Sequence, residues 1–563
     1  MYKQKEHLDY PRLTMFQMVE RNLKTVPNDI AYEFFGKKTD YVSFVKKIEQ
    51  AAAALYQAGI RMNDRVTICM PNTPQALVCF YALSRIGAVA NMVHPMSARD
   101  EITYYFNFSK SKMILTMDMF CGKVEEALLK VDHPVTILVA RMTDELPIHM
   151  AAAFFIKTGR EFIKYPNSDH AVLWSKFIKT GLGHESELPK VEFDEKRTAV
   201  ILYSGGTSGT PKGICLSDYN MNAVGIQGRE VINVPEEARG YSILACMPMF
   251  HGFGLGINIH LILSHGFTCI LMPTFNLKSY ADALIKKKPS FIAGVPTLFE
   301  ALLHIKKLDG VKLDFLKGMF CGGDSLPIEL KKNIDQFLKD HGATIQVREG
   351  YGLTECVTAS CLTPPDRYKE GSIGIAFPDM TYAIVNPGTD EVVPNGTEGE
   401  IILTGPTVML GYLDNPEETS NTLKVLPDGR TWLYTGDLGV MDDEGFVFFK
   451  QRIKRMIITN GYNVYPSQLE KVIDSVEEVA YSCVIGVKDP KRMHRVKAFV
   501  VLKPGYEPSK EIEDKIRADL KVKVAGYALP KDMEFRTELP RTLVGKVAYR
   551  QLEEEEEKAL GKV

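Results

Sequence analysis

The stretch Ile201-Leu-Tyr-Ser-Gly-Gly-Thr-Ser-Gly-Thr-Pro-Lys-Gly-Ile214 changes character halfway along. An apolar run that begins at Ala199 stops at a loop of glycines and hydroxyl residues, which carries one lysine, Lys212. Glycine lets backbone N–H groups approach an anion closely, and serine and threonine hydroxyls add donors. The pattern therefore predicts a buried strand followed by a loop that holds a polyphosphate. It is not a Walker A loop, because Pro211 precedes the lysine, and a flexible Gly/Ser linker is the alternative interpretation.

Strand-like and helix-like segments alternate around this stretch. Residues 65–70 are typical of a buried strand, and Thr73 followed by Pro74 is typical of a helix start, here of a helix that runs to about Arg85. Further strands are expected at residues 88–93, 112–116, 135–139, 198–203 and 268–272. This alternation predicts an α/β fold of mostly parallel, doubly wound sheets with helices on both faces.

The pattern changes twice towards the C-terminus. From about Thr381 the strands become shorter and are punctuated by Gly and Pro, as in residues 399–405, which indicates a small β subdomain. Beyond residues 450–455 we expect a compact α+β unit with a helix at 467–475, strands at 480–486 and 496–502, and a helix at 510–524. A chain of 563 residues is too long for one hydrophobic core. We therefore predict an N-terminal domain, residues 1–452, and a C-terminal domain, residues 453–563.

The composition is that of an ordinary globular protein, with 45% hydrophobic and 25% charged residues. The formal net charge of −2 gives no electrostatic reason to expect a nucleic-acid partner. The ten cysteines are scattered without a C-x-x-C pair, which favours a reducing cytoplasm over a disulfide framework or a zinc site. The N-terminus lacks the apolar core of a signal peptide, and no run reaches the length of a transmembrane helix.

Residues 147–164 contain an apolar run, 148–156, that is interrupted only by His149. A buried helix is the first interpretation of this segment. A helix at a membrane surface, giving peripheral membrane contact, is the second, because basic residues follow at Lys157, Arg160 and Lys164.

Four more motifs follow the phosphate loop in order. They are Glu349-Gly-Tyr-Gly-Leu-Thr-Glu355, Trp432-Leu-Tyr-Thr-Gly-Asp437, Lys450-Gln-Arg-Ile-Lys454 and Pro540-Arg-Thr-Leu-Val-Gly-Lys546. In this order the five motifs resemble the signature series of the acyl-adenylate-forming superfamily: acyl-CoA synthetases, luciferases and the adenylation domains of peptide synthetases. The resemblance runs from about Tyr41 to Leu552. It implies a large N-terminal domain followed by a small, mobile C-terminal one.

The resemblance also implies ATP, Mg²⁺ and CoA as cofactors and co-substrate, with a small-molecule carboxylic acid as the other substrate. Lys212 is expected to hold the departing phosphates, and Thr207 and Glu355 to ligate the magnesium ion, so these three and Lys546 are the implied catalytic residues. The implied nucleotide contacts are Ser204, Gly205, Gly206, Thr207, Ser208, Gly209, Thr210, Lys212, Gly322, Gly323, Glu349, Gly350, Tyr351, Gly352, Thr354, Asp437, Arg452 and Lys546.

Gly322 and Gly323 lie in Cys321-Gly-Gly-Asp-Ser-Leu-Pro327, which mimics the phosphopantetheine attachment motif of carrier domains. A carrier domain is an independent helical bundle, whereas this run follows strand-like residues within the α/β domain. We therefore interpret Ser325 as unmodified. The resemblance implies a Gly-Gly loop beside the adenine at this position, so both glycines are expected to be adenine contacts.

The C-terminal motifs are expected to serve two conformations. Asp437 suits the ribose hydroxyls, and Lys546 is implied to bridge the α-phosphate and the acyl carboxylate. Lys454 falls at the implied hinge, and Gly461 is implied to line the pantetheine tunnel after the small domain rotates. The junction departs from the family pattern at Gln451, Arg455 and Ile458, which puts the details of the second conformation in question.

The acid is predicted from what the sequence lacks. The resemblance implies that His251 and Gly352 border the acid channel. Amino-acid-activating relatives carry an Asp near His251 to pair with the substrate's ammonium, whereas no carboxylate stands there in this sequence. Gly352 occupies the position where acetate-activating relatives carry Trp. A long apolar pocket for a medium- or long-chain fatty acid is therefore favoured, with an aryl or steroidal acid as the alternative. Free CoA is favoured over an acyl carrier protein as acceptor. A nucleotide-binding regulator is the alternative from another class, and both a monomer and a homodimer fit the sequence.

Overall fold

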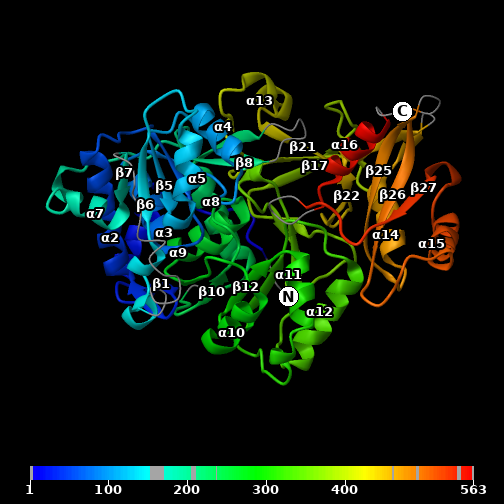
Figure 1. The fold of residues 1–563 in the computed structure, drawn as a ribbon, viewed down its shortest axis with the longest axis horizontal. Coiled ribbons are helices and arrows are strands. Elements are labelled where there is room, and N and C mark those ends of the chain that lie inside the picture. The colour runs from blue at the N-terminus through cyan, green and yellow to red at the C-terminus, as the bar shows by residue number, and fades with distance from the viewer. Residues whose placement is uncertain are drawn as a thin grey trace. The chain divides into compact units, whose positions relative to one another are not determined.

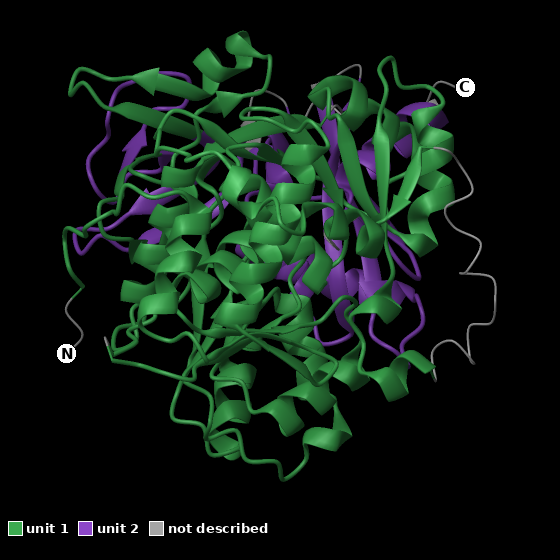
Figure 2. Ribbon diagram, turned by 90° about the vertical axis from the view of Figure 1, so that its left-hand side faces the viewer, with its two compact units in different colours: residues 1–382, 403–434 green, residues 383–402, 435–563 purple. Residues whose placement is uncertain are grey.

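The computed structural model describes residues 4–152, 170–204, 211–235, 237–459, 462–489, 493–541 and 547–560. The chain packs as two compact units (Figure 2), which we call unit 1 (residues 1–382 and 403–434) and unit 2 (residues 383–402 and 435–563). The sequence-based boundary between residues 452 and 453 separates a large domain from a small one that the resemblance implies to be mobile. It stays a prediction, because a division by packing does not test motion.

The first sheet of unit 1 has eight strands in the order β19-β9-β8-β4-β3-β5-β6-β7. Their bounds are β3 (Arg65–Cys69), β4 (Val89–Met92), β5 (Met113–Met117), β6 (Thr136–Ala140), β7 (Ala171–Leu173), β8 (Thr198–Ser204), β9 (Lys212–Ser217) and β19 (Gly411–Tyr412). The strands from β8 to β7 are parallel, while β9 and β19 extend one edge in antiparallel pairing. The strands predicted in this part of the chain are present to within one residue at each end.

The second sheet of unit 1 has nine strands in the order β16-β15-β14-β13-β12-β10-β11-β1-β2. Their bounds are β1 (Ile30–Phe34), β2 (Lys37–Asp40), β10 (Ser242–Ala245), β11 (Thr268–Leu271), β12 (Phe291–Gly294), β13 (Gly318–Cys321), β14 (Val347–Tyr351), β15 (Cys361–Leu362) and β16 (Ile375–Ala376). Pairing is parallel from β1 to β14 and antiparallel at both edges.

A layer of helices separates the two sheets. Helix α3 (Pro74–Arg85) starts as predicted, with the Thr73 hydroxyl accepting the Ala76 N–H at 3.4 Å and Pro74 in the first turn. It packs on β3 and β4, while α8 (Asp218–Val231) contacts both β8 and a π-helix, Phe253–Leu261, that packs on β10. Every residue of α3 except Arg85 is buried, as expected for a helix covered on all sides.

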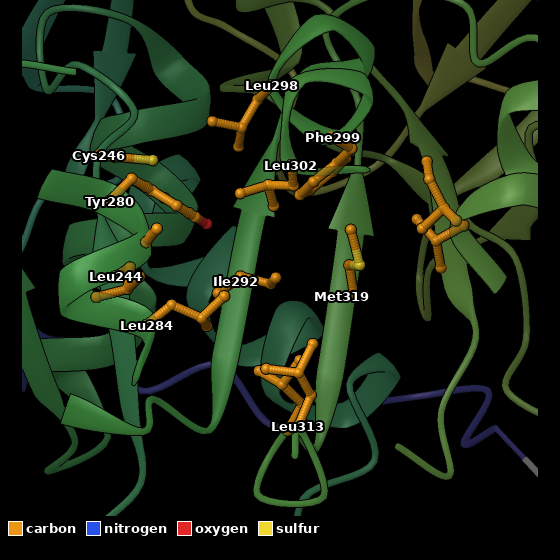
Figure 3. Packing of buried hydrophobic residues seen from close by; sticks show 14 of the residues in the cluster. Leu244, Cys246, Tyr280, Leu284, Ile292, Leu298, Phe299, Leu302, Leu313 and Met319 are labelled. Carbon is orange, nitrogen blue, oxygen red and sulfur yellow. The ribbon is translucent and has the colours of Figure 1, made fainter. Parts of the chain in front are cut away.

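Further helices cover the outer faces of the sheets. Helices α10 (Leu277–Lys287), α11 (Pro296–Leu303) and α12 (Ile328–Asp340) cover the nine-stranded sheet. Figure 3 shows this core, in which Tyr280, Phe299 and Leu302 pack against Ile292 and Met319 of the strands. Helices α4 (Arg99–Ser109) and α5 (Asp118–Leu128) cover the eight-stranded sheet. The predicted doubly wound α/β architecture is confirmed (Figure 1).

The short strands expected after Thr381 form a third sheet, in the order β17-β18-β21-β20 with β22 beside β21. Their bounds are β17 (Thr381–Val385), β18 (Gly399–Thr404), β20 (Leu423–Val425), β21 (Thr431–Met441) and β22 (Val447–Arg452).

The C-terminal part of unit 2 is the expected α+β body. Its elements are β23 (Ile457–Thr459), β24 (Tyr462–Val464), α14 (Pro466–Asp474), β25 (Val479–Asp489), β26 (Met493–Leu502), α15 (Lys510–Lys523), β27 (Asp532–Phe535) and α16 (Tyr549–Leu560). Helices α14 and α15 bury one apolar cluster, which includes Leu469, Ile473, Ile516 and Leu520, against the sheet.

None of the helices that the structure describes is long and apolar enough to cross a membrane. Of the segment 147–164, residues 153–164 lie outside the described part of the chain, so the structure does not choose between the two interpretations of that segment.

Candidate active site

The predicted phosphate loop joins two paired strands. β8 ends at Ser204 and β9 begins at Lys212, and these two residues are opposite each other in the antiparallel pair. The loop between them carries most of the predicted phosphate contacts. Its residues Gly205, Gly206, Thr207, Ser208, Gly209 and Thr210 lie outside the described residues. The structure therefore places the two ends of the motif and leaves the roles of its middle as predictions.

Lys212 and Glu355 lie in one cluster. Lys212 is paired with Glu418, and its ammonium lies 4.8 Å from the centre of the Tyr412 ring. The Tyr412 hydroxyl donates a hydrogen bond to Oε1 of Glu355 at 3.0 Å. Burial and the neighbouring Glu355 raise the pKa of Tyr412, so the phenol stays protonated and remains a donor. The cluster brings together the lysine predicted for phosphate and the carboxylate predicted for magnesium.

Strand pairing explains this meeting of distant segments. Tyr412 lies in β19, where it is opposite Ile214 of β9, the strand that begins at Lys212. Glu418 lies on the short helix α13 (Pro416–Thr422). The backbone carbonyl of Glu355 accepts the Met409 N–H at 2.9 Å, which ties the Glu355 turn to the same segment. Sequence reasoning missed both Tyr412 and Glu418. Asn415-Pro416-Glu417 does signal a helix start, but nothing local points from that helix to Lys212.

A strained turn follows Glu355. The residues Thr354–Cys356 form one 3-10 turn, and Val357 after it has φ 66° and ψ −60° with a hydrogen bond from the Thr358 N–H to the Cys356 carbonyl at 2.8 Å. This is a γ-turn with positive φ, which is rare and strained, and Val357 is β-branched and fully buried. The turn fixes the direction in which the chain leaves Glu355.

The predicted adenine segment brings together the ends of two parallel strands. Cys321 at the end of β13 pairs with Glu349 in β14, and a Cβ at Gly322 would lie 3.2 Å from the Gly350 carbonyl oxygen. Gly323 has φ +81°, which favours glycine. The Leu326 N–H donates to Oε1 of Glu349 at 3.0 Å, and burial raises the pKa of Glu349 to about 7. The four predicted residues here are therefore close together.

His251 and Gly352, predicted to border the acid channel, both lie near the strained turn. The Phe253 N–H donates to Nδ1 of His251 at 3.2 Å, so a neutral His251 carries its proton on Nε2. A Cβ at Gly252 would overlap the Val357 carbonyl oxygen, and one at Gly352 would overlap that of Thr358. A Trp at position 352 would therefore displace backbone rather than simply fill open space.

In unit 2, two of the predicted nucleotide contacts are paired with each other. Asp437 in β21 is opposite Arg452 in β22, and Nε of Arg452 lies 3.3 Å from Oδ1 of Asp437. Asp437 is 2% exposed. Lys454 lies in a 3-10 turn, Ile453–Arg455. Gly461 and Lys546 lie outside the described residues, so their implied roles stay predictions.

The chain matches two family models. The model described as AMP-binding enzyme matches residues 19–413, and the model described as AMP-binding enzyme C-terminal domain matches residues 468–546. The chain therefore belongs to the AMP-binding enzyme family, which confirms the resemblance to the acyl-adenylate-forming superfamily.

Relatives cover almost the whole chain. A long-chain-fatty-acid–CoA ligase of Bacillus subtilis is 34% identical over 98% of this chain and 96% of its own length. A protein of the same name from Escherichia coli O157:H7 is 30% identical over 98% of this chain and 95% of its own. Among solved structures, ATP-bound MatB from Rhodopseudomonas palustris superposes with a TM-score of 0.80 at 24% identity, over 96% of this chain and 99% of its own. This last similarity supports the fold.

Proposed function

We propose that this protein is an AMP-forming acyl-CoA synthetase for medium- or long-chain fatty acids. The acid's carboxylate attacks the α-phosphorus of ATP, which forms acyl-AMP and releases pyrophosphate. The thiol of CoA then attacks the acyl carbonyl, which forms the thioester and releases AMP. The observation that carries this proposal is the cluster in unit 1, where Lys212 and Glu355 meet on Tyr412. Both substrates of the first step are anions, so a cation and a metal-binding carboxylate must lie side by side.

The residues of unit 1 receive the following roles. The loop from Ser204 to Thr210 and Lys212 hold the phosphates, and Gly322 and Gly323 lie against the adenine. Glu355, with Thr207, holds the magnesium ion, which supplies charge neutralisation on the phosphates. Glu355 fits a magnesium ligand, because that ion takes one or two protein carboxylates and completes its coordination with phosphate oxygens and water. Among the residues that the structure describes, no group of three or more His, Cys, Asp or Glu could hold a metal ion without other ligands.

The residues of unit 2 serve the two half-reactions. Asp437 accepts hydrogen bonds from the ribose hydroxyls, and Arg452 holds the nucleotide from the same hairpin. Lys546 stabilises the charge that develops during adenylation. Residues 453–563 then rotate about Lys454, so that Gly461 lines the path of CoA. These roles rest on the sequence motifs, and the variants K546A and K454P test the roles of Lys546 and Lys454.

The acid is proposed from two sources. Both relatives quoted above are named as long-chain-fatty-acid–CoA ligases. The sequence around His251 contains no carboxylate for an amino acid's ammonium. We infer an apolar acid, which binds beside His251 and the backbone at Gly352.

The test is acid-dependent ATP–pyrophosphate exchange with fatty acids of graded length, followed by AMP release with CoA or with acyl carrier protein. We expect exchange that requires Mg²⁺ and peaks beyond short chains, and thioester formation with CoA. Acetate or an amino acid as best substrate would overturn the acid assignment, and an aryl acid would replace it. Transfer only to carrier protein would overturn the acceptor. ATP binding without turnover would indicate a regulator.

We also place the enzyme in the cytoplasm, because all ten cysteines are free and buried thiols. Peripheral membrane contact through residues 147–164 is proposed on the exposure of Ile148, which is 90% exposed. Cosedimentation with anionic vesicles tests this contact. Sedimentation velocity distinguishes a monomer from a homodimer.

A further inference from the structure

Lys212, the lysine proposed to hold the nucleotide's phosphates, already has an anionic partner within the chain. Its ammonium is paired with the Glu418 carboxylate, and the two side chains are 17% and 31% exposed. A carboxylate in this position supplies the negative charge that a polyphosphate would otherwise place beside Lys212. Glu418 and a bound phosphate therefore compete for the same cation.

The cluster holds Lys212 without help from Glu418. The Tyr412 ring contacts the ammonium at 4.8 Å from its centre, and the ring is itself fixed by the bond from its hydroxyl to Glu355. The backbone of Tyr412 is fixed as well, because its N–H donates to the Thr419 hydroxyl at 2.9 Å. Lys212 thus has a support that remains in place when its anion changes.

Glu418 is able to leave without unfolding its helix. Its backbone N–H donates to the side chain of Asn415, the N-cap of α13, at 3.1 Å, and the Thr419 N–H donates to the Asn415 carbonyl at 3.1 Å. These bonds fix the backbone, whereas the side chain is one-third exposed. A rotation about its χ angles is enough to release Lys212. Such a partly exposed ion pair contributes little free energy, so exchanging Glu418 for a phosphate at Lys212 has a small free-energy cost.

We propose that Glu418 is an internal counter-ion for Lys212, which is exchanged for the phosphates of the nucleotide. This inference rests on the proposed function, because it takes Lys212 as the phosphate lysine. Glu418 lowers the affinity for ATP and for pyrophosphate by a similar factor, since both place negative charge at Lys212. The return of Glu418 favours the departure of pyrophosphate after adenylation.

The experiment is calorimetric titration of the full chain with magnesium pyrophosphate, without acid. We expect E418Q to bind pyrophosphate about three- to tenfold more tightly than the unchanged protein, which is the factor that corresponds to a weak ion pair. The matched control is E417Q. Glu417 is exposed on the same helix, and its substitution removes the same charge without touching the Lys212 pair. We expect its affinity to stay within twofold of the unchanged protein (an order-of-magnitude bound).

Three outcomes would overturn the counter-ion. They are equal affinity in E418Q and the unchanged protein, an equal gain in E417Q, or weaker binding in a folded E418Q. Thermal unfolding midpoints show whether each variant folds, and E418A takes the place of E418Q with the same expected gain if the latter does not fold. If E418Q keeps exchange activity and its pyrophosphate affinity is unchanged, the counter-ion role of Glu418 is wrong and the proposed function still stands. No pyrophosphate binding in either protein would overturn the proposed function as well.

Discussion

Glu349 is the residue of the predicted nucleotide segment with the most unusual environment. Its carboxyl is buried, 7% exposed, in β14 beside the end of β13. Burial raises its pKa from the ordinary value of 4.5 to about 7, although the Leu326 N–H and the charge of Lys331 act in the opposite direction. In the folded chain the carboxyl therefore keeps its proton up to about neutral pH, while in the unfolded chain it ionises near 4.5.

This difference predicts a pH-dependent stability. Since the folded state binds the proton more tightly, the contribution of Glu349 is favourable below pH 4.5 and is lost as pH rises to about 7. E349Q keeps an acceptor for the Leu326 N–H and removes the titration. We expect the difference in the free energy of unfolding between E349Q and the unchanged protein to change with pH. As pH rises from 5 to 8, the difference should grow in favour of E349Q by at most about 3 kcal/mol. Thermal unfolding midpoints of both proteins at the two pH values measure it. A constant difference between the midpoints would contradict the raised pKa.

At the scale of residues, the sequence predicts what is local and misses what is brought together by folding. Lys212 was predicted because it stands in a loop of glycines and hydroxyl residues after a strand-like run, and Glu355 because it closes a motif that resembles one of the family. Tyr412 and Glu418 were not predicted, because they approach Lys212 only through the pairing of β19 with β9 and through helix α13. The environment of Glu349 was likewise outside the reach of the sequence, since burial depends on the neighbouring strand.

The same distinction applies to elements. The start of α3 was predicted from Thr73 and Pro74, because capping is a property of a few consecutive residues. The γ-turn at Val357 has no such signal, because β-branched residues avoid positive φ. Its strain persists only if the surrounding structure holds it. Gly252 is part of that surrounding structure, because it lies against the Val357 carbonyl with no room for a side chain.

We therefore predict that G252A disturbs the Glu355 turn. A Cβ at Gly252 overlaps a backbone oxygen, so either the turn or the start of the π-helix must shift. We expect a loss of about 1–3 kcal/mol in the free energy of unfolding, together with reduced ATP–pyrophosphate exchange. The control is G526A, because a Cβ at Gly526 meets nothing within 4 Å. Equal thermal midpoints for G252A and G526A would show that the contact at Val357 is loose.

At the scale of the whole molecule, the doubly wound α/β sheets and the α+β body were predicted from the alternation of strands and helices. How the two units work together is not visible in that alternation. Arg455, which departs from the family pattern, contacts other residues of unit 2. Its guanidinium bonds to Glu470 of α14 at 2.5 and 3.3 Å and lies 4.9 Å from the centre of the Tyr549 ring. The residue after Lys454 is thus fastened to helix α14, and the hinge at Lys454 stays a prediction.

The two half-reactions separate if this hinge and Lys546 act as proposed. K546A removes a charge needed only for adenylation, so we expect acyl-adenylate formation from acid and ATP to fall about 10²–10³-fold. The same variant, given pre-made acyl-adenylate and CoA, should form thioester at nearly the rate of the unchanged protein. K454P fixes φ at the hinge, and the 3-10 turn there tolerates that φ, so the variant should fold.

K454P is expected to show the reverse pattern, with nearly normal adenylation and a stalled thioester step, because the second conformation needs a different φ at residue 454. Pyrophosphate release measures the first step, and thioester formation measures the second. Thermal unfolding midpoints show whether both variants are folded. Equal loss of both steps in folded K546A would mean that one fixed arrangement performs both. Two conformations are needed only if K546A loses adenylation alone and K454P loses thioester formation alone. If a single site served both steps, each variant would lose both steps.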